Sequence, residues 1–205
     1  MDENKDGLLK QIADHLIVNS SFLPNLGLYH GRMGIVLFFV NYARYTDNYL
    51  YQEYAEYLLD DILEDLHSDI ALDFENGLSG IGWGILYLLK AHFMEGDPDE
   101  VLSDIDRKIM EVSLSRVTDR SVERGLGGYL YYLLERLSVA SERSILDVSY
   151  KMELQEVLSV VQLKELFDLQ SLIRQNTVCS IVNIARDLLG IQDGYAGYGF
   201  KLMQV

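Results

Sequence analysis

The chain has 205 residues, of which 49% are hydrophobic and 24% charged, a composition typical of a globular protein and not of a disordered chain. Its formal net charge of −15 argues against binding to nucleic acid or to an anionic membrane surface, because both depend on clustered lysine and arginine. The single cysteine, Cys179, excludes an internal disulfide framework and fits a reducing compartment.

The N-terminal residues 1–6 are acidic and adjoin no apolar core, so they do not predict a secretory signal. No apolar run approaches the roughly 18 residues of a membrane span. We therefore expect a cytoplasmic protein without a membrane partner. The acidic balance is compatible with a cationic partner such as a basic peptide segment, although acidic side chains also coat helices for solubility.

Apolar residues at helical spacing predict a short amphipathic helix over residues 7–18. After it, glycine-led and nearly all-apolar helices alternate with amphipathic helices that carry acidic faces. The predicted apolar helices cover residues 32–45, about 78–93 and 125–137. The predicted amphipathic helices cover residues 48–67 and 99–116. A helix that is apolar on nearly every side is buried, whereas an amphipathic one has a solvated face.

The regularity fades after Ser138. Apolar spacing predicts two helices within residues 145–174 and another over residues 178–189. A fourth glycine cluster follows at residues 194–199. No run shows the alternation of a half-buried strand, so we expect an all-α fold.

The glycine clusters form an internal repeat, because Gly27, Gly77 and Gly125 follow one another at intervals of 50 and 48 residues. Alternating buried and half-buried helices predict two concentric layers of helical hairpins, which is an α/α toroid. An open solenoid of helix pairs is the alternative. The ring is favoured because an open array would leave one face of each apolar helix in water.

These clusters resemble the helix-opening motifs of the lanthionine-synthetase-C-like family, over residues 25–138 and more weakly over 190–203. The motifs are Gly27-Leu28-Tyr29-His30-Gly31-Arg32-Met33-Gly34, Gly77-Leu78-Ser79-Gly80-Ile81-Gly82-Trp83-Gly84, Gly125-Leu126-Gly127-Gly128 and Gly194-Tyr195-Ala196-Gly197-Tyr198-Gly199. The resemblance implies a double ring of helices. Members of the family that are cyclases add peptide cysteine thiols to dehydrated serine or threonine, and the resemblance implies the same chemistry here, at a zinc ion held by two cysteines and a histidine.

The chain departs from the cyclase pattern at the implied zinc ligands. It has one cysteine and no Cys-His-Gly triplet, and its last glycine cluster begins Asp193-Gly194-Tyr195. It is also about half as long as a complete cyclase. We therefore predict a single domain over residues 1–205, a shortened or incomplete toroid, with no zinc site and no cofactor.

Three residues are candidates for catalysis: His30, Asp73 and Glu75. Helical toroids also host carbohydrate enzymes that use paired carboxylates or histidines, which Asp73 and Glu75 could supply before Gly77. The alternative is that these acids cap the following helix and interact favourably with its dipole. Glu123 and Asp193 hold comparable places before their own glycines, which favours capping.

Five residues are candidates for binding: Tyr29, His30, Arg32, Trp83 and Tyr195. His30 and Arg32 could hold an anion at a helix N-terminus, or His30 could fill a contact between helices. The aromatic residues could line a cleft for a peptide or a sugar, or could fill the core beside the glycines.

The leading functional hypothesis is an accessory role in peptide modification, in which the chain binds or presents a peptide or meets a modifying enzyme. An active enzyme with a non-zinc site, thioether-forming or carbohydrate-directed, is the second hypothesis. The third is a structural unit that completes its ring as a homodimer, because an incomplete ring exposes apolar helix faces.

Overall fold

A computed structural model describes residues 3–66, 69–140, 146–161, 168–175 and 188–203. Every regular element in these ranges is helical, which confirms the all-α prediction. The α-helices are α1 (Glu3–Asn19), α2 (Arg32–Thr46), α3 (Tyr49–Asp65), α4 (Leu78–Lys90), α5 (Pro98–Val101), α6 (Ser103–Ile109), α7 (Leu126–Val139), α8 (Val148–Val160), α9 (Leu169–Gln175) and α10 (Tyr195–Met203). The short 3-10 helices are η1 (Ser20–Phe22) and η2 (Leu114–Arg116). Of the helices described, none has the length and apolarity needed to cross a membrane.

Most predicted helices appear close to their expected bounds, and one is divided. Residues 99–116 form α5, α6 and η2 in place of one continuous helix. The break falls at Leu102, whose backbone angles leave the helical range while its side chain is fully buried. No glycine or proline marks this break, and apolar residues continue at helical spacing on both sides of it. The sequence pattern therefore does not reveal the break. The helix predicted over 178–189 lies almost wholly outside the described residues.

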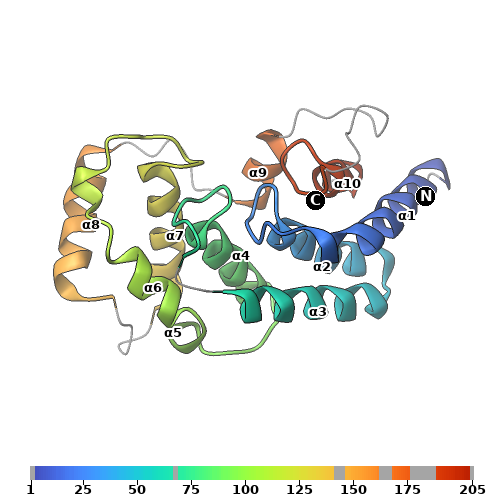
Figure 1. Cartoon of the computed structure of the whole chain (residues 1–205), viewed down its shortest axis with the longest axis horizontal. Coiled ribbons are helices and arrows are strands. Elements are labelled where there is room, and N and C mark those ends of the chain that lie inside the picture. The colour runs from blue at the N-terminus through green and yellow to red at the C-terminus, as the bar shows by residue number, and fades with distance from the viewer. Residues whose placement is uncertain (1–2, 67–68, 141–145, 162–167, 176–187, 204–205) are drawn as a thin grey trace. The chain divides into compact units, whose positions relative to one another are not determined.

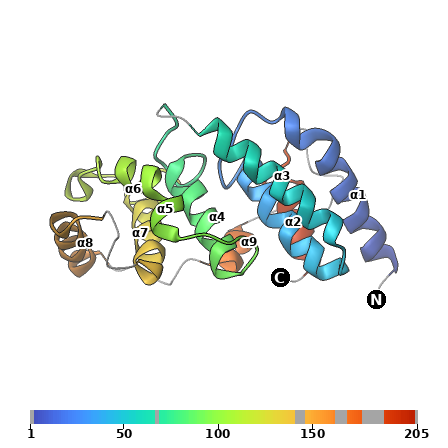
Figure 2. The same cartoon turned by 90° about the horizontal axis from the view of Figure 1, so that it is seen from below.

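The chain divides into two compact units, which are described separately. The first unit comprises residues 1–68 and 168–205 and contains α1, α2, α3, α9 and α10. Helices α2 and α3 form a hairpin and lie side by side in Figures 1 and 2. The C-terminal helix α10 packs against both α1 and α2, so the last glycine-led helix of the chain adjoins the first.

The second unit comprises residues 69–167 and contains α4 to α8. Its two glycine-led helices, α4 and α7, pack against each other, and α6 packs on α4. Helix α8 packs against η2 (Figure 1). In both units the glycine-led helices are the most buried elements: residues 32–43 of α2 and 78–86 of α4 are all buried. The predicted alternation of buried and half-buried helices is therefore present within each unit.

Each glycine-led helix is closed at its N-terminus by the loop that precedes it. The first backbone N–H of the helix donates to the carbonyl oxygen seven residues earlier. These bonds are Arg32 to Asn25 (2.8 Å), Leu78 to Ala71 (2.8 Å), Leu126 to Asp119 (2.9 Å) and Tyr195 to Leu188 (2.9 Å). We call residues 25–31, 71–77, 119–125 and 188–194 the opening loops. Because the loop bonds to the helix end, it satisfies N–H groups that have no partner inside the helix.

The residue before each of these helices is a glycine for a steric reason. We call Gly31, Gly77, Gly125 and Gly194 the capping glycines. A Cβ atom on any of them would lie closer than 3.0 Å to backbone atoms of its own opening loop, a separation that real side chains do not adopt. The first repeat is thus in register through Gly31 and not through Gly27. The interval to Gly77 becomes 46 residues, and all four repeats read Gly-x-x-Gly from the capping glycine.

The helices within each unit also interlock at equivalent positions, counted from the capping glycine as zero. At position +5, Gly82 of α4 faces the Tyr132 ring of α7, and Gly199 of α10 faces the Phe38 ring of α2. Both aromatic residues occupy position +7 of their own helix. A side chain at either glycine would collide with the ring, so small and large residues fit together in the same way in both units.

Substitution of a capping glycine is predicted to destabilise the protein. Gly77→Ala would place a Cβ atom against the Ala71 carbonyl, which lies in the backbone and has little freedom to move. We expect the free energy of unfolding to fall by about 1–3 kcal/mol, measured by urea denaturation and circular dichroism.

Gly7→Ala is the matched control, because Gly7 lies within a helix, α1, and a Cβ atom there meets nothing within 4 Å. It should leave stability unchanged or raise it by up to about 1 kcal/mol. Equal effects of the two substitutions would contradict the steric account.

Candidate functional site

The opening loops are held together in pairs, one pair in each unit. In the second unit the backbone N–H of Glu75 donates to the carbonyl oxygen of Glu123 (2.9 Å). In the first unit the N–H of Gln192 donates to the carbonyl oxygen of Tyr29 (3.0 Å). All four residues occupy position −2 from their capping glycines. The same bond, made at the same positions, therefore fixes two neighbouring helix ends in each unit.

In each loop pair, an apolar side chain of one loop packs against the glycine-led helix that follows the other loop. Phe74, at position −3, lies where a Cβ atom on Gly128 would be, and Ile191 has the same relation to Gly34. Both glycines occupy position +3 of the neighbouring glycine-led helix. Phe74 and Ile191 are fully buried or nearly so. The loops therefore rest on close-packed apolar side chains and have little room to shift.

The side chains next to the capping glycines are polar and reach solvent. We call the following residues at positions −1 and −2 the loop rim: His30, Gln192 and Asp193 in the first unit, and Glu75, Asn76, Glu123 and Arg124 in the second. Each is at least partly exposed, whereas the helix behind each loop is buried. The loop rim is the place where polar groups are presented at fixed positions by a rigid backbone.

In the first unit, His30 is partly exposed at position −1, and Asp193 holds the same position before Gly194. Asp193 adopts a left-handed backbone with φ of 53°, which is uncommon for a residue with a side chain. Strained backbone of this kind is concentrated at binding and catalytic sites. Asp193 is therefore the rim residue that departs furthest from ordinary loop geometry.

Arg32, at position +1, is directed into the protein. Its guanidinium donates to Asp65 (Nη2 to Oδ2, 2.7 Å) and lies 3.8 Å from Asp61, both on α3. The side chain is only 10% exposed. The backbone N–H groups of Arg32 and Met33 donate to the loop carbonyls of Asn25 and Leu26. The N–H groups expected to hold an anion beside His30 are thus bonded within the loop, and the binding role of His30 and Arg32 stays a prediction.

In the second unit, Asp73 and Glu75 are both engaged in local structure. Asp73 Oδ1 accepts from the backbone N–H of Asn76 (2.8 Å). Glu75 Oε2 accepts from Arg124 Nε (2.8 Å), which joins the two opening loops by an ion pair. The pairing with Glu75 raises the pKa of Arg124. These contacts lie within and between the opening loops, and no side chain of the described residues caps the N-terminus of α4. The catalytic role of Asp73 and Glu75 stays a prediction.

The three aromatic candidates lie in the core. Tyr29, Trp83 and Tyr195 are 2%, 3% and 8% exposed. The Tyr195 ring lies against His15 with their centroids 4.2 Å apart, and Trp83 stacks on Tyr87 at 6.2 Å. Their binding role stays a prediction, and direct contact with a ligand would require these side chains to become accessible.

The described residues do not fit the zinc ion that the resemblance implies for cyclases. Within these ranges no three His, Cys, Asp or Glu side chains gather as metal ligands. Gln192 and Asp193 stand directly before Gly194, where a Cys-His pair would precede the glycine. An amide and one carboxylate do not replace a thiolate and an imidazole as zinc ligands. Cys179 lies outside the described residues.

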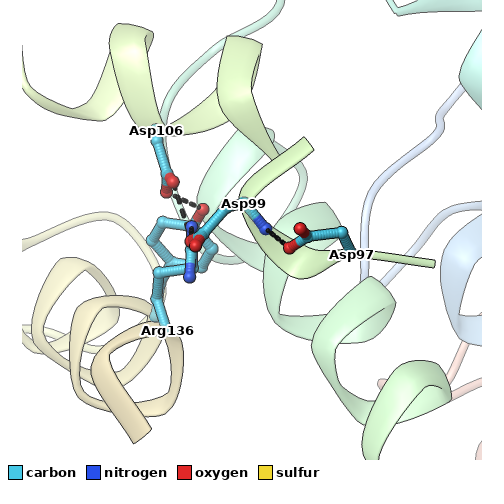
Figure 3. Close-up of polar contacts among 5 residues, drawn as sticks. Asp97, Asp99, Asp106 and Arg136 are labelled. Atoms are coloured by element: carbon cyan, nitrogen blue, oxygen red, sulfur yellow. Dashed lines mark hydrogen bonds and ion pairs between the residues drawn. The ribbon is translucent and has the colours of Figure 1, made fainter. Parts of the chain in front are cut away.

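A buried charged cluster, which sequence patterns did not reveal, lies between α5, α6 and α7 in the second unit (Figure 3). Arg136 of α7 is fully buried and binds two carboxylates, donating from Nη2 to Asp99 and from Nε to Asp106 (2.9 Å). The Tyr132 hydroxyl also donates to Asp106 (2.6 Å). Burial raises the pKa of Asp106, although the hydrogen bonds from Tyr132 and Arg136 oppose the shift. The sequence signal for this cluster was that Tyr132 and Arg136 are four residues apart, which places both on one face of α7.

The structure thus defines an all-helical protein of paired glycine-led helices whose opening loops carry a polar rim. A family model described as lanthionine synthetase C-like protein matches residues 21–181. The chain belongs to this family, whose members are α/α toroids. The comparisons found no match among curated proteins or solved structures.

Removal of the buried guanidinium is predicted to unfold the second unit readily. Arg136→Met would leave Asp99 and Asp106 buried without their cation, at a cost of about 3–5 kcal/mol in the free energy of unfolding. Trp83 is the single tryptophan of the chain and lies in the same unit, so its fluorescence during urea denaturation gives the measurement.

Arg107→Met is the control, because Arg107 and Asp104 form an ion pair with side chains 66% and 87% exposed. Such pairs contribute little, and we expect a change within about 0.5 kcal/mol. A similar loss of stability in both variants would contradict a special role for the buried cluster.

Proposed function

We propose that the chain binds a peptide at the loop rim, in an accessory role in peptide modification. Family membership supplies the context of peptide chemistry. The observation that carries the proposal is the loop pairing: a backbone bond between residues at position −2 holds two polar loop ends side by side in each unit, and in the second unit the N–H of Phe74 adds a bond to the same Glu123 carbonyl (3.0 Å). Preorganised polar groups lose little conformational freedom when a ligand binds, which favours affinity.

The polar chemistry of the loop rim suits a peptide. The rim combines carboxylates, amides, an imidazole and a guanidinium, and these groups donate to and accept from backbone amides and hydroxyl side chains. The rim of each unit is also acidic: in the second unit Arg124 is paired with Glu75, which leaves the charge of Glu123, and in the first unit the rim holds Asp193 and no lysine or arginine. A peptide with basic residues near its modified segment is therefore the preferred ligand.

A binding role is favoured over catalysis by what the acidic candidates contact. Asp73 accepts from the backbone N–H of Asn76 in its own loop, and Glu75 pairs with Arg124, so both carboxylates hold the loops. A general base needs instead to lie within hydrogen-bond reach of a substrate proton. The accessory role assigns these carboxylates to the scaffold and the remaining rim side chains to the peptide.

The first test of the proposal is a binding titration. A fluorescent peptide that contains cysteine, serine, threonine and flanking lysines is titrated with the protein, and a dehydrated form of the same peptide is compared. We expect Asp193→Asn in the first unit and Glu123→Gln in the second each to weaken binding at the rim of its own unit by about three- to tenfold, the loss typical of one hydrogen bond. Asparagine tolerates the left-handed backbone of Asp193, so this variant removes the charge and keeps the loop conformation.

Asp104→Asn is the control for Glu123→Gln, because it also removes one carboxylate from the second unit, at a side chain 87% exposed and outside the loop rim. It should not change the affinity. Absence of peptide binding, or binding that none of the rim variants alters, would overturn the proposal.

The same peptide also distinguishes binding from catalysis. Thiol addition to a dehydrated residue leaves the peptide mass unchanged, so the remaining thiols are counted by alkylation and mass spectrometry. The accessory role predicts no loss of thiol beyond the rate without protein. Loss of thiol that depends on His30 would replace the accessory role with a cyclase that uses a non-zinc site.

A further inference from the structure

A cavity in the first unit lies at the opposite end of α2 from its opening loop. It has a volume of about 240 Å³ and is lined by Asp6 of α1 and by Tyr42, Tyr45 and Thr46 of α2. This volume is below the roughly 300–1,000 Å³ of pockets that enclose drug-sized ligands. The cavity therefore suits a small group, such as the end of one side chain, and it is separate from the loop rim.

The chemistry of the lining favours a cation. One carboxylate, Asp6, lies beside two tyrosine rings, and the Tyr45 hydroxyl donates to its Oδ1 (2.8 Å). A cation of the chain already lies over one of these rings: Lys5 Nζ is 5.3 Å from the centroid of Tyr45. Cations within about 6 Å of an aromatic centroid are attracted by the ring quadrupole. The ring face and the carboxylate therefore attract the same kind of ligand.

The second unit has a cation, the guanidinium of Arg136, at the position that corresponds to this cavity. Tyr42 and Arg136 both occupy position +11 from their capping glycines, one turn beyond Phe38 and Tyr132 at position +7. Phe38 and Tyr132 face equivalent glycines, so the two helices are in the same rotational register. Both positions lie near acidic side chains of other helices: Asp6 of α1 lines the cavity together with Tyr42, and Asp99 and Asp106 bind Arg136.

The two units differ in the side chain at position +11. In the second unit, the Arg136 guanidinium belongs to the chain and is fully buried between its carboxylates (Figure 3). In the first unit, tyrosine replaces arginine at position +11, and a cavity with a carboxylate and aromatic rings is present. A guanidinium is planar, stacks on aromatic rings and bonds to a carboxylate with two N–H groups, which an ammonium does not do.

We propose that the cavity between α1 and the C-terminal end of α2 binds the guanidinium group of a ligand, with Asp6 as the ion-pair partner and Tyr42 and Tyr45 as the aromatic walls. In this arrangement the ligand supplies to the first unit the group that Arg136 supplies to the second. The side chain of an arginine in a bound peptide and a free guanidinium compound share this chemistry. Lys5 competes with the ligand for the Tyr45 ring.

The test is an NMR titration with Nα-acetyl-arginine methylamide. We expect saturable shifts of the Tyr42 and Tyr45 ring signals, and affinity reduced about tenfold in Asp6→Asn, as for loss of a hydrogen bond to a charged group. The citrulline analogue has nearly the same shape without the charge and should not bind. Asp104→Asn makes the same change of net charge at a side chain 87% exposed in the second unit, and it should bind like the wild type.

Lys5→Gln keeps the proposal testable if Asp6→Asn alters the fold. It removes the competing ammonium, so we expect binding to become several-fold tighter. A pentapeptide with one central arginine distinguishes the two sources: binding at least as tight as that of the amino acid analogue assigns the cavity to a peptide side chain, and binding of guanidinium ion alone assigns it to a small cation. Equal binding of the arginine and citrulline analogues, or no shift of the two tyrosine rings, would overturn the proposal.

Discussion

The contact on which the rest of the structure depends is that between each opening loop and the helix that it precedes. The loop bonds back onto the first N–H groups of the helix, so closely that the residue between them has no room for a Cβ atom. This contact fixes the loop against its own helix. The fixed loops can then be paired through backbone hydrogen bonds to a single carbonyl oxygen, and the pairing sets where the rim side chains lie.

Two units with different sequences reach the same arrangement through sterically matched positions. An apolar residue at −3 lies over a glycine at +3, and a glycine at +5 faces an aromatic ring at +7. These rules leave other positions free to vary, such as +11, where the first unit has Tyr42 and the second has Arg136. Function can differ between the units while the frame that carries it remains the same, as is common when sites are built on repeated folds.

The sequence predicted the fold better than the site. Apolar spacing located the buried helices, and the glycine clusters indicated both the repeat and the family. The register of the first repeat, through Gly31, could not be read from the spacing of glycines, because the loop contact that selects the capping glycine is a tertiary one. The burial of Tyr29, Trp83 and Tyr195, the cluster around Arg136 and the break at Leu102 likewise depend on neighbours distant in the sequence.

The measurement that tests the paired loops most directly is amide hydrogen exchange at Glu75 and Gln192. Both amides lie in loops, where exchange is ordinarily fast, yet both donate to the carbonyl oxygen of a neighbouring loop. We predict that they exchange far more slowly than in an unstructured chain, with protection close to that of the amides inside the helices that follow. Exchange of these two amides at unstructured rates, while the helix interiors stay protected, would contradict the account.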